Sequence, residues 1–378
     1  MKWNIPLFKI YWEKDDIKAI TEIIKRGKYW ATGKEIKEFE KKIARFVGTK
    51  YAISFNSGTS ALHILLLAYN IKGKEVIVPS FTFIATANAV VLAEGKPVFA
   101  ESENKTFSLD YNDVKSKITE NTKAIITLHY GGFPSKDINK LRKLAKKKDL
   151  ILIEDSAESL GASIGEKKVG SFGDSSIFSF CQNKIISTGE GGMIVTNSKV
   201  IYEKAKLMRS HGRIETSSDY FSSIKDNDYI EVGYNLRMST MSAALGLSQL
   251  SKINKIIKIR RIHAKYLNKH LTKINEINII KEIKGFYSVY QMYTIILKNN
   301  KIRNNLQDFL KEKKIMTKIY FNPIHLKTFY KKESGYKEGD LPKSEELSKK
   351  VLTLPLYVNL KKKELDYIIS NIKKFFEK

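Results

Sequence analysis

Three short segments carry residues whose types and order could do chemistry together. In "NSGTSAL", Gly58 and Thr59 lie between an apolar run and a helical pattern, so backbone amides and hydroxyls there could hold a phosphate. The run "LILIEDS" ends in Asp155, a carboxylate that could pair with a cationic ring nitrogen. Lys184 follows another apolar run and precedes the glycine-rich "STGEGG". A desolvated lysine at such a place can form a Schiff base.

Each segment alone also has an ordinary structural interpretation. "SGTS" is a common helix cap, Asp155 could cap the next turn, and a single lysine is normally a solvated surface residue. Together, however, the three supply what pyridoxal phosphate needs. Its phosphate needs amides and hydroxyls, its pyridine nitrogen needs an anion, and its aldehyde needs an amine.

Signatures of other chemistries are absent from the sequence. It contains no GxxxxGK[ST] phosphate loop, no HExxH and no GxSxG, and its six histidines do not cluster. The single cysteine, Cys181, excludes an internal disulfide and a cysteine-rich metal site. The sequence therefore predicts no metal centre.

The elements that must position these segments follow from the apolar pattern. Short apolar runs alternate with helical patterns over some 200 residues, which predicts an α/β domain with a mostly parallel sheet. Such sheets bind ligands at the carboxyl ends of their strands, where all three segments lie. Strands are predicted at Tyr51–Ser54, Glu75–Val78, Pro97–Ala100, Ala124–Leu128, Leu150–Glu154, Ser176–Phe180 and Met193–Thr196, and helices at Ser60–Tyr69, Ile84–Leu92, Ile138–Lys147 and Lys199–Arg209.

The two ends of the chain have patterns of their own. "DDIKAITEIIKRGKY" and "KEIKEFEKKIARFVG" predict amphipathic helices on either side of a loop at Trp30–Gly33. One long helix is expected from Met238 to about Arg261, leading out of the sheet domain, and the strand-like "YQMYTIIL" follows it. We therefore expect an N-terminal arm and helix (1–30), a large domain (31–250) and a small α+β domain (251–378).

The chain of 378 residues has a formal net charge of +27, and its 42% hydrophobic residues exclude a wholly disordered protein. Residues 251–378 carry +18 of this charge, which could mark a nucleic-acid surface. Most basic residues are lysines scattered through amphipathic helical patterns, however, so nucleic acid is an unlikely partner. A positive field would also attract an anionic substrate such as a nucleotide diphosphate. Because the N-terminus does not resemble a signal peptide and no run suits a membrane span, the prediction is a cytoplasmic protein without a membrane partner.

Several long blocks, in this order, resemble the DegT/DnrJ/EryC1/StrS family of sugar aminotransferases. Among them are "KEFEKKIARFVGTKYAISFNSGTSALHILLLA", "EVIVPSFTFIATANAVVLAEGKPVF", "DLILIEDSAESLGA" and "VGYNLRMSTMSAALGLSQL". The resemblance implies the aspartate-aminotransferase fold (pyridoxal-phosphate fold type I). That fold has a large α/β domain with a mostly parallel seven-stranded sheet and a smaller α+β C-terminal domain.

The resemblance also implies a role for each matching residue. Lys184 would form the Schiff base with pyridoxal 5'-phosphate and move the proton during catalysis, and Asp155 would pair with the pyridinium. Glu158 would lie near the phenolic oxygen of the cofactor, and Phe83 would stack on its ring. The phosphate ligands would be Gly58, Thr59, Ser179 and, across a homodimer with shared active sites, Asn235 of the partner subunit.

The implied reaction transfers an amino group from L-glutamate to a nucleotide-linked keto sugar in a ping-pong cycle. The commonest acceptor would be a 4-keto-6-deoxy sugar, giving a product like perosamine for polysaccharide or glycan synthesis. The alternatives are a 3-keto sugar, a sugar dehydratase with the same cofactor, and a non-catalytic regulator. Loops at Tyr29–Gly33 and His211–Asp228 are expected to shape the sugar pocket, with substrate contacts at Trp30, Thr32 and His325. Cys181, three residues before Lys184, departs from the family pattern of His, Asn or Phe.

Overall fold

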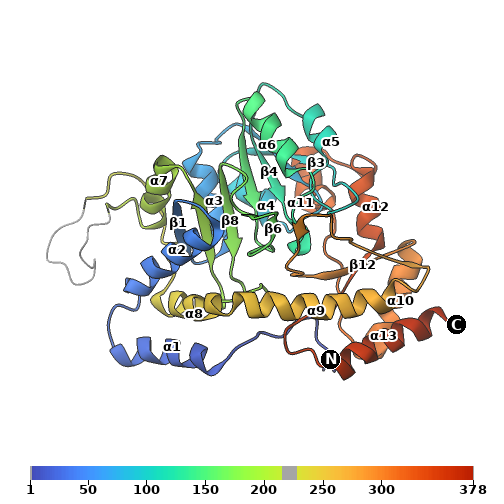
Figure 1. The fold of residues 1–378 in the computed structure, drawn as a ribbon. Helices are drawn as coiled ribbons and strands as arrows, with labels where there is room; N and C mark the ends of the chain where they lie inside the picture. Colours follow the sequence, from blue (N-terminus) through green and yellow to red (C-terminus); the bar gives the residue numbers. More distant parts are fainter. Residues whose placement is uncertain (1, 215–227, 378) are drawn as a thin grey trace.

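The computed structural model describes residues 2–214 and 228–377, and a seven-stranded sheet lies at its centre (Figure 1). The strand order is β1-β9-β8-β5-β4-β2-β3, and β9 alone runs antiparallel to its neighbours. The predicted α/β fold class is therefore confirmed. The strands are β1 (Tyr51–Phe55), β2 (Glu75–Pro79), β3 (Lys96–Ala100), β4 (Thr122–Leu128), β5 (Ile151–Asp155), β8 (Ser175–Ser179) and β9 (Gly192–Thr196).

Helices cover both faces of this sheet. Alternate residues of a strand belong to different cores: Val76 and Val78 pack with α3 and α4, whereas Ile77 packs with α6. A strand buried on both faces has an almost continuous apolar sequence, which explains why these strands were visible as short apolar runs. The covering helices are α3 (Gly58–Ala68), α4 (Ala85–Leu92), α5 (Tyr111–Ser116), α6 (Ile138–Lys147) and α7 (Lys199–Arg209).

Two consecutive helices form a long helical edge below the sheet in Figure 1 and run from beside α2 toward the C-terminal part of the chain. They are α8 (Thr240–Ser251) and α9 (Ile253–Leu271), and α8 packs against α1 (Lys14–Arg26) and α2 (Lys34–Val47). The single helix expected from Met238 to Arg261 was wrong, because Lys252 interrupts it. The N–H of Lys252 bonds the carbonyls of Gln249 and Leu250 instead of continuing the α-helical ladder.

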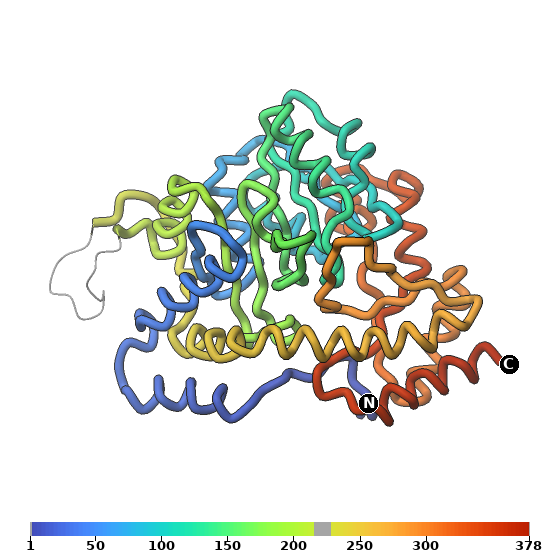
Figure 2. Tube along the Cα trace, viewed as in Figure 1, coloured from blue at the N-terminus to red at the C-terminus, as the bar shows by residue number. Residues whose placement is uncertain are grey.

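The C-terminal part forms a smaller α+β unit around a three-stranded antiparallel sheet, in the order β10-β12-β13. The N-terminal arm lies beside this unit: Ile5 pairs with Ile315, and Lys9 Nζ lies 3.8 Å from Glu364 Oε1 (Figure 2). Its elements are β10 (Ile277–Ile279), β12 (Tyr293–Leu297), α10 (Asn300–Glu312), α11 (Thr328–Ser334), α12 (Pro342–Lys350), β13 (Val351–Leu354) and α13 (Lys362–Phe376).

A third sheet of very short strands was not expected from the sequence. It pairs β11 (Phe286–Tyr287) with β6 (Ser163–Ile164), and β6 with β7 (Lys167–Lys168). Two-residue strands leave no periodic pattern to detect. Within residues 2–214 and 228–377, no helix is long and apolar enough to cross a membrane.

Candidate active site

Six parallel strands end at one edge of the large sheet, and the three segments singled out in the sequence follow the ends of some of them. Strands β1, β8, β5, β4, β2 and β3 all run in the same direction. Gly58 follows β1, Ser179 and Asp155 are the last residues of β8 and β5, and Lys184 follows β8. The topology therefore gathers the three segments that lie far apart in the sequence.

The start of α3 has the donors for a phosphate. Ser57 caps this helix by accepting a hydrogen bond from the N–H of Ser60 at 3.0 Å, so Gly58 and Thr59 occupy the first turn, where backbone N–H groups have no helical acceptor. A Cβ on Gly58 would lie 3.0 Å from the Cβ of Ser179, closer than ordinary contact. Gly58 thus lets the helix start approach the end of β8, and amides and hydroxyls there fit an anion.

The carboxylate of Asp155 is held in one orientation. Its Oδ2 accepts a hydrogen bond from Thr86 Oγ1 at 2.8 Å, and its Oδ1 accepts one from the N–H of Ala157 at 3.2 Å. The side chain is buried. Thr86, from the first turn of α4, was missed in the sequence, because nothing in its local pattern connects it with a residue 69 positions away.

Lys184 has an acidic neighbour in the same place. Its Nζ lies 3.8 Å from Glu158 Oε1, while Glu158 Oε2 accepts a hydrogen bond from the N–H of Gly131 at 2.9 Å. Burial raises the pKa of Glu158, and Lys184 and the Gly131 amide act in the opposite direction. Glu158 was predicted near the phenolic oxygen of the cofactor, but neither Glu158 nor Gly131 was predicted to lie beside this lysine.

Cys181 lies in the same turn, since its carbonyl accepts a hydrogen bond from the N–H of Lys184 at 3.0 Å. Its thiol points to Glu190 Oε1 at 3.4 Å, and burial, with Glu190, raises the pKa of the thiol. A raised pKa keeps the sulfur protonated and weakly nucleophilic near neutral pH. Cys181 is therefore a neighbour of Lys184 and not a competing nucleophile.

The donor set at these strand ends fits pyridoxal phosphate, and sequence comparisons point to the same class of enzyme. The model of the DegT/DnrJ/EryC1/StrS aminotransferase family matches residues 11–373. The chain belongs to this family. It is therefore an enzyme of the sugar-aminotransferase class, as the resemblance implied.

Named relatives of this family member include nucleotide-sugar enzymes. The chain is 34% identical over 345 residues to the GDP-perosamine synthase of Escherichia coli O157:H7, covering 91% of each chain. It is 33% identical over 371 residues to a UDP-4-amino-4,6-dideoxy-N-acetyl-beta-L-altrosamine transaminase of Campylobacter jejuni, covering 97% of this chain and 96% of the other. The solved structure of Helicobacter pylori PseC, an aminotransferase of pseudaminic acid biosynthesis, superposes with a TM-score of 0.91 at 29% identity and full coverage of both chains.

Three other residues predicted for the site of this aminotransferase-family chain, Phe83, Asn235 and Trp30, are exposed to solvent. Phe83 follows β2 with 59% of its surface exposed, and its ring centroid is 6.4 Å from that of Phe321. Asn235 is exposed. Trp30 donates its indole N–H to the carbonyl of Ile23, and its own carbonyl accepts from the N–H of Thr240, so this loop is fastened to the helical edge.

The prediction that His325 contacts the substrate is not supported by its surroundings. The ring is completely buried, with Nδ1 2.6 Å from Ser80 Oγ and Nε2 3.2 Å from Glu345 Oε1. Both ring nitrogens are thus occupied within the chain. Although Ser80, His325 and Glu345 form a line of hydrogen bonds, the Ser80 hydroxyl is completely buried, so they do not form a nucleophilic triad. His325 connects the segment after β2 to α12.

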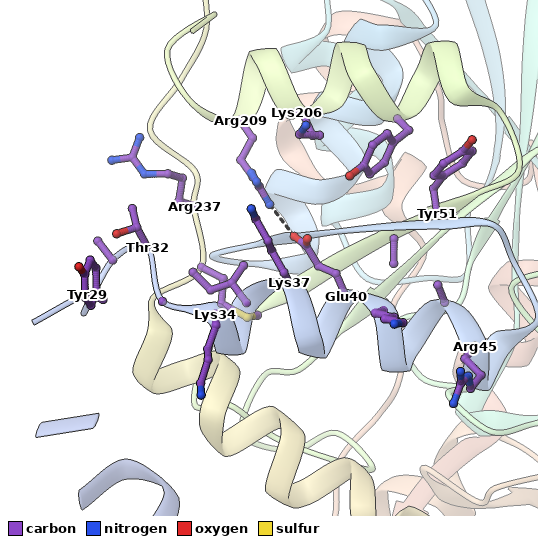
Figure 3. A pocket seen from close by; sticks show the side chains of 18 of the residues that line it. Tyr29, Thr32, Lys34, Lys37, Glu40, Arg45, Tyr51, Lys206, Arg209 and Arg237 are labelled. Carbon is purple, nitrogen blue, oxygen red and sulfur yellow. Dashed lines mark hydrogen bonds and ion pairs between the residues drawn. The ribbon is translucent and has the colours of Figure 1, made fainter. Parts of the chain in front are cut away.

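A large cavity lies outside the group around Lys184, between α2 and α7 along the edge strand β1 (Figure 3). Its volume is about 1180 Å³, and Thr32 of the predicted substrate loop lines it. On its floor Arg209 Nη1 lies 2.7 Å from Glu40 Oε1. Of the described lining residues ten are basic, and Glu40 is the one acid. The basic residues are Arg26, Lys34, Lys37, Lys41, Arg45, Lys50, Lys206, Arg209, Arg213 and Arg237.

Proposed function

We propose that this chain is a pyridoxal-phosphate-dependent aminotransferase that moves an amino group from L-glutamate to a nucleotide-linked keto sugar. The observation that carries the proposal is the grouping of Lys184 with Glu158, beside the oriented Asp155 and the anion cradle at Gly58. Family membership over residues 11–373 supports the same reaction class.

Each side chain has a defined task in this proposal. Bound pyridoxal phosphate supplies an aldehyde and an electron-withdrawing ring that stabilises negative charge at the α-carbon of an amino acid. Asp155, fixed by Thr86, would hold the proton on the ring nitrogen. The Nζ of Lys184 would take the α-proton and return it, and the ring of Phe83 would cover one face of the cofactor. Gly58, Thr59 and Ser179 would bind the phosphate.

The acceptor is proposed to be a 4-keto-6-deoxy sugar attached to a nucleotide. The names of the relatives support a nucleotide sugar, one with GDP and one with UDP. The cationic lining of the cavity beside Thr32 favours an anionic group such as a diphosphate. A 3-keto sugar is the alternative acceptor. Loop residues 215–227, expected to help shape the sugar pocket, lie outside the described residues.

We also propose that two chains share their active sites in a homodimer. Asn235, the predicted phosphate ligand of the partner cofactor, is exposed in the single chain. The segment before it exposes apolar side chains, including Ile230 and Val232 at 56% and 88%. Exposed apolar groups beside a polar ligand residue suit a surface that a second chain covers.

The experiment is an absorbance scan of the purified protein with pyridoxal phosphate, before and after L-glutamate, beside Lys184→Ala. In the wild type we expect a visible band that glutamate converts to the spectrum of the aminated cofactor. The variant, lacking the proton carrier, should not complete this conversion, and its rate should fall by at least about 10³-fold. Lys146→Ala, at an exposed position of α6 away from the cavity, is the matched control and should behave as wild type.

The other possible outcomes of this scan would each favour a different function. A band that glutamate leaves unchanged would contradict glutamate-dependent transamination and favour another donor or a sugar dehydratase. Absence of any band would contradict the cofactor itself and favour a regulator, for which salt-dependent DNA binding is the next measurement. If conversion occurs, 4-keto and 3-keto nucleotide sugars are compared as acceptors.

A further inference from the structure

Next to Asp155, on the other face of the sheet, lie two buried titratable side chains that the proposed reaction does not use. Glu154 precedes Asp155 in β5, so its side chain points to the opposite face of the sheet. His129 follows β4, the neighbouring strand. Neither side chain has any exposed surface, and His129 Nε2 lies 3.0 Å from Glu154 Oε2.

The carboxylate of Glu154 is fully satisfied by hydrogen bonds. Besides His129, the N–H of Gly170 donates to its Oε2 at 2.9 Å, and the N–H groups of Phe172 and Gly173 donate to its Oε1 at 2.7 Å each. Although burial by itself raises a carboxyl pKa, these donors hold the pKa of Glu154 below its usual value. Glu154 therefore stays ionised and ties the segment after β7 to the strand that ends in Asp155.

The hydrogen bonds also fix the tautomer of His129. Its Nδ1 accepts a hydrogen bond from the N–H of Ser135 at 2.8 Å, so the proton of the neutral ring is on Nε2, which donates to Glu154. The ring thus joins the two ends of the segment 129–135 and anchors both to β5. The backbone N–H of His129 adds a hydrogen bond to the carbonyl of Asp155 at 3.3 Å.

Inside that anchored segment lies the amide that holds Glu158. Gly131 and Gly132 both have positive φ, at 59° and 90°, and the turn they form presents the Gly131 N–H to Glu158 Oε2. A Cβ on Gly132 would lie 2.7 Å from Val289, so the turn has little room to shift. A continuous set of contacts therefore runs from Glu154 through His129 and the turn to Glu158, beside Lys184.

We propose that the buried His129–Glu154 pair is a positioning device of the active site: it holds the 129–135 segment so that the Gly131 amide keeps the Glu158 carboxyl group beside Lys184 Nζ. The inference rests on the proposed function for its purpose. The contacts themselves need neither cofactor nor substrate, so it can be tested on the protein alone. His129 and Glu154 are positioning residues and touch no reacting atom.

Two substitutions of His129 separate its two hydrogen bonds. His129→Gln places an amide N–H near the position of Nε2 and keeps the donor to Glu154. His129→Asn places an amide oxygen near Nδ1, keeps the acceptor for Ser135, and loses the bond to Glu154. His263→Asn is the matched control, since His263 is a partly buried histidine on α9 whose Nδ1 contacts the carbonyl of Tyr357.

The measurement is the acetylation rate of Lys184, read peptide by peptide by mass spectrometry in cofactor-free protein at pH 8. When Glu158 loses its amide partner, its carboxylate is no longer held beside Lys184 Nζ, and that nitrogen becomes more accessible to the reagent. We expect His129→Asn to accelerate acetylation of Lys184 about threefold relative to distant lysines, the effect of losing one ion pair of ordinary strength. His129→Gln and His263→Asn should stay close to the wild-type rate. In the holoenzyme, His129→Asn should also shift the pH midpoint of the visible absorbance.

Several results would overturn the proposal. One is a folded His129→Asn with an unchanged Lys184 rate, and another is a His129→Gln as reactive as His129→Asn. If His129→Asn does not fold, hydrogen exchange of the wild type decides. The amides of Gly131, Gly170 and Phe172 must then be protected as strongly as those of β5, and fast exchange contradicts the proposal. A wild type that ignores glutamate would remove the proposed function but leave these results standing.

Discussion

At the scale of single residues, Thr86 is a part of the site that no sequence pattern indicated. Its hydroxyl donates to Asp155 Oδ2 at 2.8 Å, and this is a hydrogen bond to a charged group in a buried place. Such bonds contribute more than neutral ones because the carboxylate would otherwise lose its solvation without compensation. Thr86 therefore helps to fix the orientation of the Asp155 carboxylate.

Thr86→Val should weaken cofactor binding while leaving the shape of the core almost unchanged. We expect the affinity for pyridoxal phosphate to fall by about tenfold, which corresponds to about 1.4 kcal/mol. An absorbance titration of the apoprotein measures it. Thr127→Val is the control, because within the described residues the buried Thr127 Oγ1 has no hydrogen-bond partner. Equal affinities of both variants would show that the hydroxyl of Thr86 has no effect on the cofactor.

The sequence predicted residues at strand ends better than their partners. Gly58, Asp155 and Lys184 each adjoin an apolar run, so a local pattern placed them at one edge of a parallel sheet. Thr86 and the Gly131 amide reach the site only through tertiary packing, which a local pattern does not contain. His325 shows another limit of a local pattern: its context predicted a substrate contact, whereas its two ring nitrogens contact Ser80 and Glu345 within the chain.

At the scale of elements, a buried ion pair fastens α1 to the helical edge. Asp16 Oδ1 lies 2.7 Å from Lys252 Nζ, and Asp16 Oδ2 accepts a hydrogen bond from Gln249 Nε2 at 2.9 Å. Lys252 is the residue that separates α8 from α9. No glycine or proline lies at this break, which explains why the periodic pattern suggested one continuous helix. Lys252 thus helps to hold α1, a helix more than 200 residues away in the chain, against α8 and α9.

This pair makes the stability of the protein depend on pH in a defined direction. Burial raises the pKa of Asp16, but its bonds with Lys252 and Ser248 and the Glu13 amide outweigh burial, so the net pKa is lowered. The unfolded chain then takes up its proton at higher pH than the folded one, near 4. The stabilisation is present above that pH and is lost as the pH falls toward the lower, folded pKa.

Asp16→Asn should accordingly lower the free energy of unfolding at pH 7 by about 3 kcal/mol, since it leaves the buried ammonium unpaired. Urea unfolding at pH 7 and at about pH 3, below the unfolded pKa of Asp16, measures the effect, and the difference from wild type should shrink at the lower pH. Asp15→Asn, an exposed neighbour in the same turn, is the control and should stay within about 0.5 kcal/mol. A pH-independent difference would assign the loss to packing and not to the ion pair.

At the scale of the whole molecule, the basic residues behind the net charge of +27 are unevenly distributed. Ten basic residues surround the cavity between α2 and α7, where the edge strand β1 lies. The neighbouring segment that leads to Asn235 exposes apolar side chains. A single chain therefore presents, along one border of its large sheet, a cationic hollow and an uncovered apolar segment. Periodicity could not predict this surface, because it depends on which loops meet at the border.

The dimer proposed above should depend on that apolar segment. Val232, with 88% of its surface exposed, would have to leave water when a second chain covers it, and a buried unpaired charge there is costly. Val232→Asp should convert the protein to a 43.3 kDa monomer in sedimentation velocity runs at micromolar concentration. Because Asn235 of the partner subunit would then be missing from each site, the variant should also bind pyridoxal phosphate at least about tenfold more weakly. Ile262→Asp, at an exposed position of α9, is the matched control and should remain dimeric. A wild type that sediments as a monomer, or a Val232→Asp that stays dimeric, would move the shared-site surface away from this segment.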